Sequence, residues 1–142
     1  MSIIIPCKEV DAYTRECIER CLELDYQNFR IILLPDKMSK NVWDLKKVRI
    51  IPTGSLTPGS KRNIGVNNSN EEICAFIDSD AYPAIDWLSN AINYFQDTQV
   101  AAVGGPGITP KEDSVMQQAS GYVLSSFMVG QISMRYKSKK VI

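Results

Sequence analysis

The fold is decided by one stretch, Ile73-Cys74-Ala75-Phe76-Ile77-Asp78-Ser79-Asp80-Ala81-Tyr82-Pro83, in which five apolar residues run directly into two carboxylates. An apolar run of this length without alternation is typical of a strand that is buried on both faces of a parallel sheet. We therefore predict a buried strand at 73–77. It would release Asp78 and Asp80 at its carboxyl end, the edge where open α/β sheets bind ligands.

The two aspartates favour a bound cation. Asp78 and Asp80 are two residues apart, so on an extended chain both carboxylates point to the same side. Two carboxylates this close repel each other unless a cation lies between them. A divalent ion that carries a phosphate ligand meets this condition, because magnesium-type sites combine one or two carboxylates with substrate phosphate oxygens. The alternative is a solvated turn in which an aspartate caps a helix.

Apolar strands and helices alternate along the rest of the chain. Besides 73–77, we expect strands at 2–5, 29–34, 48–52 and 100–103, and helices at 11–24, 60–68, 86–95 and 114–124. The polar segment 37–47 favours no more than a helical turn. Repeated strand–helix units predict a three-layer α/β/α sandwich with a mostly parallel sheet. No linker or repeat interrupts the sequence, so we expect a single domain over residues 1–142.

The composition narrows the chemistry that this chain can perform. Its 16 basic and 16 acidic residues balance, so no electrostatic attraction to nucleic acid is expected. The absence of histidine excludes Ser-His and Cys-His catalysis. The four cysteines fit no metal pattern, and no apolar run reaches the roughly 18–20 residues of a membrane span. Without a signal peptide either, the sequence favours a cytoplasmic protein with reduced thiols, in solution or peripheral at the inner face of the membrane.

Ligand-capable side chains gather at the predicted carboxyl ends of the strands. The acids there are Glu9, Asp36, Asp78 and Asp80. The helix start at 60–63 is expected to offer free backbone amides, and its Lys61 and Arg62 add positive charge that suits an anion. The same two cations could instead pair with the aspartates or lie on a solvated helix face. A nucleoside diphosphate with a divalent ion would use all of these groups.

Four motifs, in order along the chain, resemble those of a known family. They are Ser-Ile-Ile-Ile-Pro-Cys-Lys-Glu at 2–9, Pro-Gly-Ser-Lys-Arg-Asn-Ile-Gly at 58–65, Phe-Ile-Asp-Ser-Asp-Ala-Tyr-Pro at 76–83 and Val-Gly-Gly-Pro at 103–106. Together they are similar to the first strand, the Arg-Asn-x-Gly segment, the Asp-x-Asp motif and the following strand of family 2 glycosyltransferases. The resemblance implies a Rossmann-like GT-A nucleotide-diphospho-sugar transferase fold, here in truncated form.

The resemblance also implies roles for individual residues. Asp80, with Asp78, would hold Mg²⁺ or Mn²⁺ against the diphosphate, and Asp78 would also contact the ribose. Glu9 and Asp36 would lie along the base and the ribose. The full set of nucleotide-binding residues implied by the motifs is Pro6, Glu9, Asp36, Lys61, Arg62, Asn63 and Asp78.

The implied function is metal-dependent, inverting transfer of a sugar from a UDP-, GDP- or dTDP-sugar to an acceptor hydroxyl. The acceptor could be a saccharide, a lipid carrier or a protein. The resemblance covers the donor-binding half, and no residue after Asp80 matches the family's later catalytic carboxylate. An apolar face left by that missing half would also favour self-association into a homo-oligomer.

Other classes of protein remain as alternatives. A non-catalytic nucleotide-sugar-binding or assembly module would need the same motifs without a base. In a P-loop protein, Gly-Lys-Ser/Thr would have to follow the first glycine at a fixed spacing, whereas here Ser60 separates Gly59 from Lys61. An Asp-x-Asp phosphatase would carry its aspartates at the first strand, and the strand at 2–5 carries none.

Overall fold

Four parallel strands form the sheet at the centre of residues 1–96. They are β1 (Ser2–Pro6), β2 (Arg30–Leu34), β3 (Val48–Ile50) and β4 (Cys74–Phe76), in the spatial order β3-β2-β1-β4. A computed structural model describes residues 1–38, 46–110 and 113–125, and the chain forms two units, Met1–Gln96 and Asp97–Ile142. The single domain expected over residues 1–142 stays a prediction.

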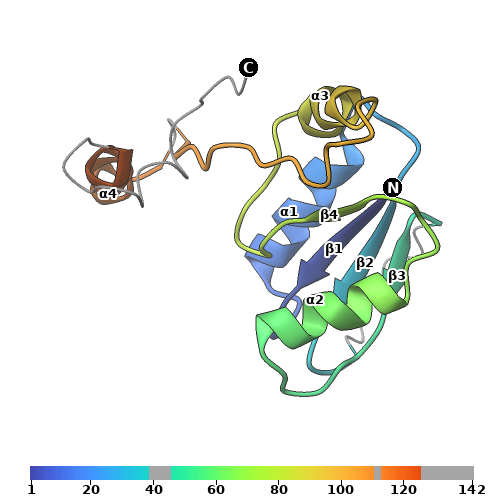
Figure 1. The fold of residues 1–142 in the computed structure, drawn as a ribbon. Helices are drawn as coiled ribbons and strands as arrows, with labels where there is room; N and C mark the ends of the chain where they lie inside the picture. The colour runs from blue at the N-terminus through green and yellow to red at the C-terminus, as the bar shows by residue number, and fades with distance from the viewer. Residues whose placement is uncertain (39–45, 111–112, 126–142) are drawn as a thin grey trace. The chain divides into compact units, whose positions relative to one another are not determined.

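Helices cover both faces of the sheet. The helices of this unit are α1 (Ala12–Leu22), α2 (Pro58–Asn67) and α3 (Trp87–Tyr94), and the second unit contains α4 (Val115–Ser125). α1 and α2 lie on opposite faces (Figure 1). Ile3 and Ile5 of β1 share a core with Ile18 of α1, whereas Ile4 between them belongs to a second core that Ile64 of α2 borders. The unalternating apolar strands thus supply both cores, because successive side chains of a strand alternate between faces. The predicted α/β/α sandwich is confirmed.

Asp11 caps α1, as the sequence predicts. Its Oδ1 accepts hydrogen bonds from the N–H and the hydroxyl group of Thr14, both at 2.8 Å. These bonds hold the pKa of the Asp11 carboxyl below its usual value, because they favour the charged form. α1 ends at Leu22, two residues before its expected end, and α3 adds the buried Leu88 to the core beneath α1.

The expectation that the 73–77 strand is buried on both faces is wrong. β4 covers only Cys74–Phe76, and Phe76 is 46% exposed. The reason is its place at the edge of the sheet, where β1 is its one neighbour among the described strands. Residues 100–103, expected as a further strand, have no strand structure, which fits the low strand propensity of Ala101 and Ala102.

α4 lies within the second unit and confirms the expected helix at 114–124. The Ser114 hydroxyl oxygen accepts the N–H of Gln117 at 3.4 Å at the start of this helix. The predicted helical turn within 37–47 falls largely on residues 39–45, outside the described part of the chain. Within the described ranges, no helix combines the length and the apolar character that crossing a bilayer requires.

Candidate functional site

The parallel sheet brings the carboxyl ends of β1, β2 and β4 to one edge. Pro6 is the buried last residue of β1, whereas Glu9, Asp78 and Asp80 are exposed in the loops that follow the strands. After β1, the chain adds β2 and then β3 on one side of it. It then returns and adds β4 on the other side of β1, so the direction in which strands are added reverses at β1. This arrangement is a topological switch point, where open α/β sheets bind their ligands.

Lys61 is buried between the ends of β1 and β2. Its side chain is 3% exposed, and its Nζ donates to the carbonyl oxygens of Cys7 at 2.6 Å and of Leu34 at 3.2 Å. The same ammonium forms an ion pair with Asp36 Oδ1. An ammonium has three N–H donors, so all of them are used. Lys61 therefore ties two strand ends together and fixes Asp36. The sequence left open whether Lys61 pairs with an aspartate, and the structure shows that it does.

Asp36 is also held through its backbone. Its N–H donates to the carbonyl oxygen of Lys8, and its carbonyl oxygen accepts the N–H of Gly54, both at 3.0 Å. The Asp36 side chain keeps 18% of its surface exposed. A carboxylate that is held by its backbone and by Lys61, yet reaches the surface, is suited to accept hydrogen bonds from a ligand without further ordering.

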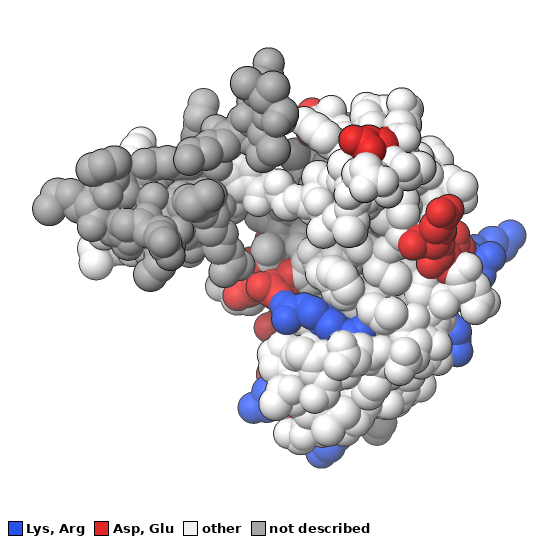
Figure 2. Space-filling model, viewed as in Figure 1, with Lys and Arg blue, Asp and Glu red and all other residues white. Residues whose placement is uncertain are grey.

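Arg62 pairs with the first aspartate of the Asp-x-Asp motif. Its Nη2 donates to Asp78 Oδ1, which connects α2 to the loop after β4. The Arg62 side chain is 33% exposed and that of Asp78 is 48% exposed. Figure 2 shows a largely uncharged molecular face on which a basic strip touches an acidic one. An ion pair in contact with water contributes about 0–1 kcal/mol, so a ligand can separate it readily.

The predicted start of α2 is wrong by three residues. Thr57, not Ser60, is the N-cap: its hydroxyl oxygen accepts the N–H of Ser60, and Pro58 takes the first helical position. The N–H of Lys61 already donates to the Thr57 carbonyl oxygen at 3.0 Å. Residues 60–63 therefore do not present free backbone amides, and the cationic character of this segment comes from side chains alone. Asn63 lies exposed on α2.

Gly65 explains how α2 comes close enough to bury Lys61. A Cβ atom at this position would lie 2.5 Å from Ile4 Cγ2 and 3.1 Å from Leu34 Cδ1. Lys61 and Gly65 are four residues apart, so they share the helix face that lies on the sheet. This i,i+4 spacing was the sequence signal that Lys61 points inward.

Two acids of the site make no described contact. The side chains of Glu9 and Asp80 are exposed and form no hydrogen bond or ion pair within the described ranges. Nor do three Cys, Asp or Glu side chains come together there in a cluster that could hold a metal. Two carboxylates, those of Asp78 and Asp80, are too few to surround an ion by themselves. They suit an ion whose other ligands are oxygen atoms of a bound diphosphate, as for Mg²⁺ or Mn²⁺.

Cys7, Cys17 and Cys21 are free cysteines that are buried in the structure. Burial raises the pKa of the Cys7 thiol to about 11. A hydrogen bond with Cys17, together with burial, also raises the pKa of Cys21. The Cys17 thiol donates weakly to the Asp78 carbonyl oxygen at 3.6 Å. Cys7 and Cys21 are therefore packing groups rather than nucleophiles.

Comparison with known proteins identifies the family of this fold and motif set. The model of glycosyl transferase family 2 matches residues 2–141. An uncharacterized glycosyltransferase of Haemophilus influenzae is 30% identical over 115 residues, which are 74% of this chain and 46% of that protein. A dolichyl N-acetyl-alpha-D-glucosaminyl phosphate 3-beta-D-2,3-diacetamido-2,3-dideoxy-beta-D-glucuronosyltransferase of Methanococcus voltae is 28% identical over 122 residues, 74% of this chain and 38% of its own. The chain spans less than half the length of either relative.

Solved structures share the architecture. The mannosyltransferase PcManGT from Pyrobaculum calidifontis, in complex with GDP-Man and Mn²⁺, matches 78% of this chain and 36% of its own with a TM-score of 0.66 at 19% identity. S. aureus TarS 1-349, in complex with UDP-GlcNAc, matches 87% of this chain and 42% of its own with a TM-score of 0.56 at 22% identity. These likenesses show the GT-A fold. With the sequence match over residues 2–141, they establish that the chain belongs to glycosyl transferase family 2.

Proposed function

We propose that this chain forms the donor-binding half of a glycosyltransferase, which moves a sugar from a nucleotide-diphosphate sugar to an acceptor hydroxyl. The observation that carries the proposal is the pairing of two cations of α2 with two acids at the switch point of the sheet, Lys61 with Asp36 and Arg62 with Asp78. Neighbouring folds in complex with GDP-Man, UDP-GlcNAc and UDP support a nucleotide sugar as the ligand.

The nucleoside is proposed to lie over the ends of β1 and β2. Asp36, held by Lys61 and by two backbone hydrogen bonds, would accept hydrogen bonds from the base or the ribose. Glu9 has an exposed carboxylate in the loop after β1 and would also accept hydrogen bonds from the base or the ribose. Pro6 is buried at the end of β1, so its proposed part is to end the strand beneath the nucleoside rather than to contact the base. With the nucleoside over the ends of β1 and β2, the diphosphate would lie near the end of β4.

The diphosphate and its ion are proposed to lie at Asp78 and Asp80. Mg²⁺ or Mn²⁺, bound there with the diphosphate, would neutralise the charge that builds up on the leaving nucleoside diphosphate. Asp80 is exposed and unpaired among the described residues, so it can accept the ion directly. Asn63, exposed on α2 next to Arg62, would add a neutral donor for a phosphate oxygen.

Arg62 is proposed to change partners when the donor binds. In the structure its guanidinium pairs with Asp78. A diphosphate offers a stronger partner than one exposed carboxylate, because a guanidinium binds phosphate oxygens in a bidentate manner. Arg62 would then hold the diphosphate while Asp78 turns to the ion or the ribose.

In this proposal, all four acids at the carboxyl edge of the sheet (Glu9, Asp36, Asp78 and Asp80) bind the donor. An inverting transfer also needs a carboxylate that takes the proton of the acceptor hydroxyl. We assign no described residue to that task, so the proposal for these residues is donor binding, and inversion rests on the family alone. A module that binds the donor without transferring its sugar is the alternative outcome of the experiment.

The test is calorimetric titration of UDP, GDP and dTDP into the chain, with and without Mn²⁺. We expect one nucleotide to bind, more tightly with Mn²⁺, and Asp80→Ala to lose the metal-dependent part. Asp25→Ala, another exposed aspartate, is the matched control. Incubation of the matching nucleotide sugar with the chain then separates binding alone from release of free sugar. Failure of all three nucleotides to bind would contradict the proposal.

A further inference from the structure

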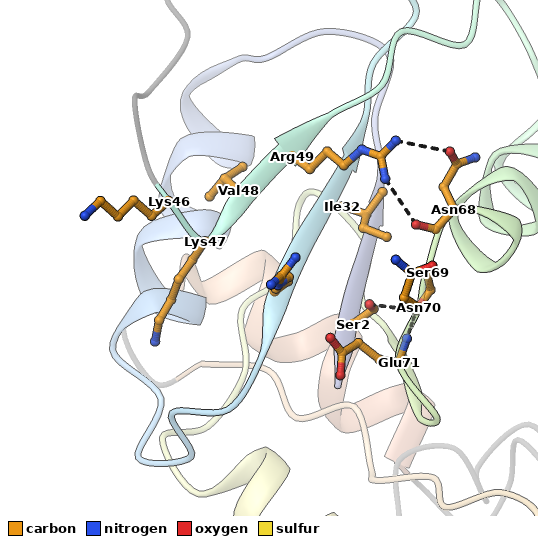
Figure 3. Close-up of a pocket in the computed structure, with 11 residues that line it drawn as sticks. Ser2, Ile32, Lys46, Lys47, Val48, Arg49, Asn68, Ser69, Asn70 and Glu71 are labelled. Carbon is orange, nitrogen blue, oxygen red and sulfur yellow. Dashed lines mark hydrogen bonds between the residues drawn. The ribbon is translucent and has the colours of Figure 1, made fainter.

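A concave site lies at the amino edge of the same sheet, opposite the proposed nucleotide site. It is a cavity of about 100 Å³, and Figure 3 shows the side chains that line it. Ser2 of β1, Arg30 of β2 and Arg49 of β3 belong to its sheet side, and residues 68–71 after α2 close it. From Ser2 to Pro6, β1 rises by about 13 Å, so this cavity is well separated from the carboxyl edge.

The lining of this cavity is strongly cationic. It includes Arg30, Lys46, Lys47 and Arg49, against Glu71 as its one carboxylate. The whole chain has equal numbers of basic and acidic residues, so a ratio of four to one is a local concentration. Glu71 is itself engaged, because its Oε2 lies 3.3 Å from the amino group of Met1.

The sheet register places the two arginines on one face. Ser2 pairs with Arg30, and Ile32 pairs with Arg49. Arg30 and Ile32 are two residues apart on β2 and therefore share a face, so Arg30 and Arg49 lie on the same face of neighbouring strands. They are diagonal neighbours rather than directly opposite residues, a separation at which two long side chains can reach one anion together.

Both arginines have donors to spare. The Arg30 side chain forms no hydrogen bond or ion pair within the described ranges, whereas its backbone N–H donates to the Met1 carbonyl oxygen. Arg49 donates to the backbone and side-chain oxygens of Asn68 at 3.3 and 3.5 Å, long and exposed contacts that help to cap the end of α2 (Figure 3). A guanidinium has five N–H donors, so Arg49 can also bind an anion.

The two lysines contribute charge rather than direct contacts. Lys47 Nζ donates to the carbonyl oxygen and Oε1 of Gln27 at 3.2 and 2.9 Å, and lies 4.5 Å from the centre of the Phe29 ring. In Figure 3, Lys46 and Lys47 point away from Arg49. They raise the positive potential around the cavity, while Arg30 and Arg49 are placed to make the hydrogen bonds.

We propose that this cavity binds a phosphate group, at a site separate from the nucleotide site. Pockets for whole organic ligands measure roughly 300–1,000 Å³, so a cavity of about 100 Å³ suits a single phosphate rather than a nucleotide. Two guanidinium groups on one sheet face match the bidentate geometry of phosphate oxygens. The phosphate belongs either to a phosphorylated small molecule or to the headgroup of an anionic phospholipid.

The first test is NMR titration of the chain with inorganic phosphate at constant ionic strength. We expect saturable shifts in the amide signals of Arg30, Arg49 and residues 68–70. Arg30→Ser should weaken binding about tenfold or more, because a hydrogen bond to a charged group contributes about 1.5–3 kcal/mol. The Arg30 side chain is exposed and makes no hydrogen bond or ion pair with a described residue, so we expect this variant to keep the fold. Glu71→Gln should strengthen binding, since it removes the one carboxylate.

Arg20→Ser is the matched control, because Arg20 is a half-exposed arginine of α1 in an ion pair with Glu23. The source of the phosphate is tested by sedimentation with vesicles of phosphatidylcholine, with and without 30% phosphatidylglycerol. Binding to the anionic vesicles that is lost in Arg30→Ser assigns the site to a lipid headgroup. Binding of inorganic phosphate without vesicle binding assigns it to a phosphorylated small molecule. Neither kind of binding, or binding that Arg20→Ser weakens as much as Arg30→Ser, would overturn the proposal.

Discussion

Arg62 and Asp78 form an ion pair that joins α2 to the loop after β4 across the carboxyl edge of the sheet. Both side chains are partly exposed, so water weakens their attraction and a ligand can replace either partner. The pair neutralises one of the two carboxylates, whereas Asp80 is exposed and has no cationic partner among the described residues. The donor site is thus suited to an ion that arrives together with a diphosphate.

Arg62→Gln should strengthen the binding of Mn²⁺ to the empty chain, because Asp78 loses the cation that competes with the ion. An exposed ion pair contributes at most about 1 kcal/mol, so we expect an increase of about fivefold or less. Nucleotide affinity should fall at the same time, since the diphosphate loses a cationic partner. Electron paramagnetic resonance of free Mn²⁺ measures the first effect and calorimetry the second. Arg20→Gln serves as control, and equal Mn²⁺ affinity in wild type and Arg62→Gln would contradict this role.

Lys61→Met should destabilise the chain by about 3 kcal/mol. The change keeps the length of the side chain but leaves Asp36 and the carbonyl oxygens of Cys7 and Leu34 without their donor. Urea denaturation measures the loss. The double variant Lys61→Met/Asp36→Leu should recover part of it, because no unpaired carboxylate remains. If the double variant is less stable than Lys61→Met, the ion pair is not the source of the loss.

Gly65→Ala should cost about 1–3 kcal/mol of stability and shift α2 away from the sheet. The added methyl group would lie 2.5 Å from Ile4 Cγ2, which is closer than packed carbon atoms approach. Gly59→Ala is the matched control, because a Cβ atom there has no neighbour within 4 Å. Thermal unfolding of both variants checks the difference. Equal melting temperatures for the two would show that α2 packs less closely than described.

Cys7 should make the stability of the chain fall at high pH. Burial raises the pKa of its thiol in the folded state from 9.0 to about 11. The folded state therefore favours the protonated thiol, and this contribution is complete below pH 9 and lost as the pH rises toward 11. Urea denaturation at pH 8 and pH 10.5 measures the change, and Cys7→Ala shows what other groups contribute. An identical fall in stability in Cys7→Ala would assign the effect elsewhere.

Sequence periodicity predicted the elements whose signal is local. β1 and β2 are apolar runs that end at proline or just before it, and Asp11 is a helix cap, so their bounds follow from short stretches. The predicted start of α2 differs from the observed one because Ser60 is also a good capping residue. The pair Thr57-Pro58 was the better signal, since proline favours the first helical position directly after a capping residue.

What the sequence could not give depends on tertiary contacts. The exposure of Phe76 follows from the position of β4 at the edge of the described sheet, which no local pattern encodes. The sequence predicts that the acids lie at one edge of the sheet, because parallel strands end at the same edge. The parallel pairing of β1 with β2 and with β4 agrees with this. Which cation meets which acid was left open, because the partners of Lys61 and Arg62 depend on how closely α2 approaches the sheet.

The most direct test of the donor site follows the paramagnetic broadening that Mn²⁺ causes in NMR spectra of the chain. In the presence of the nucleotide selected by calorimetry, Mn²⁺ should broaden the amide signals around Asp78 and Asp80 at concentrations that leave the chain alone unaffected. Asp80→Ala should remove this broadening, and Asp25→Ala should keep it. Broadening elsewhere in the chain, or broadening that persists in Asp80→Ala, would contradict the assignment of these two aspartates to a nucleotide-bound ion.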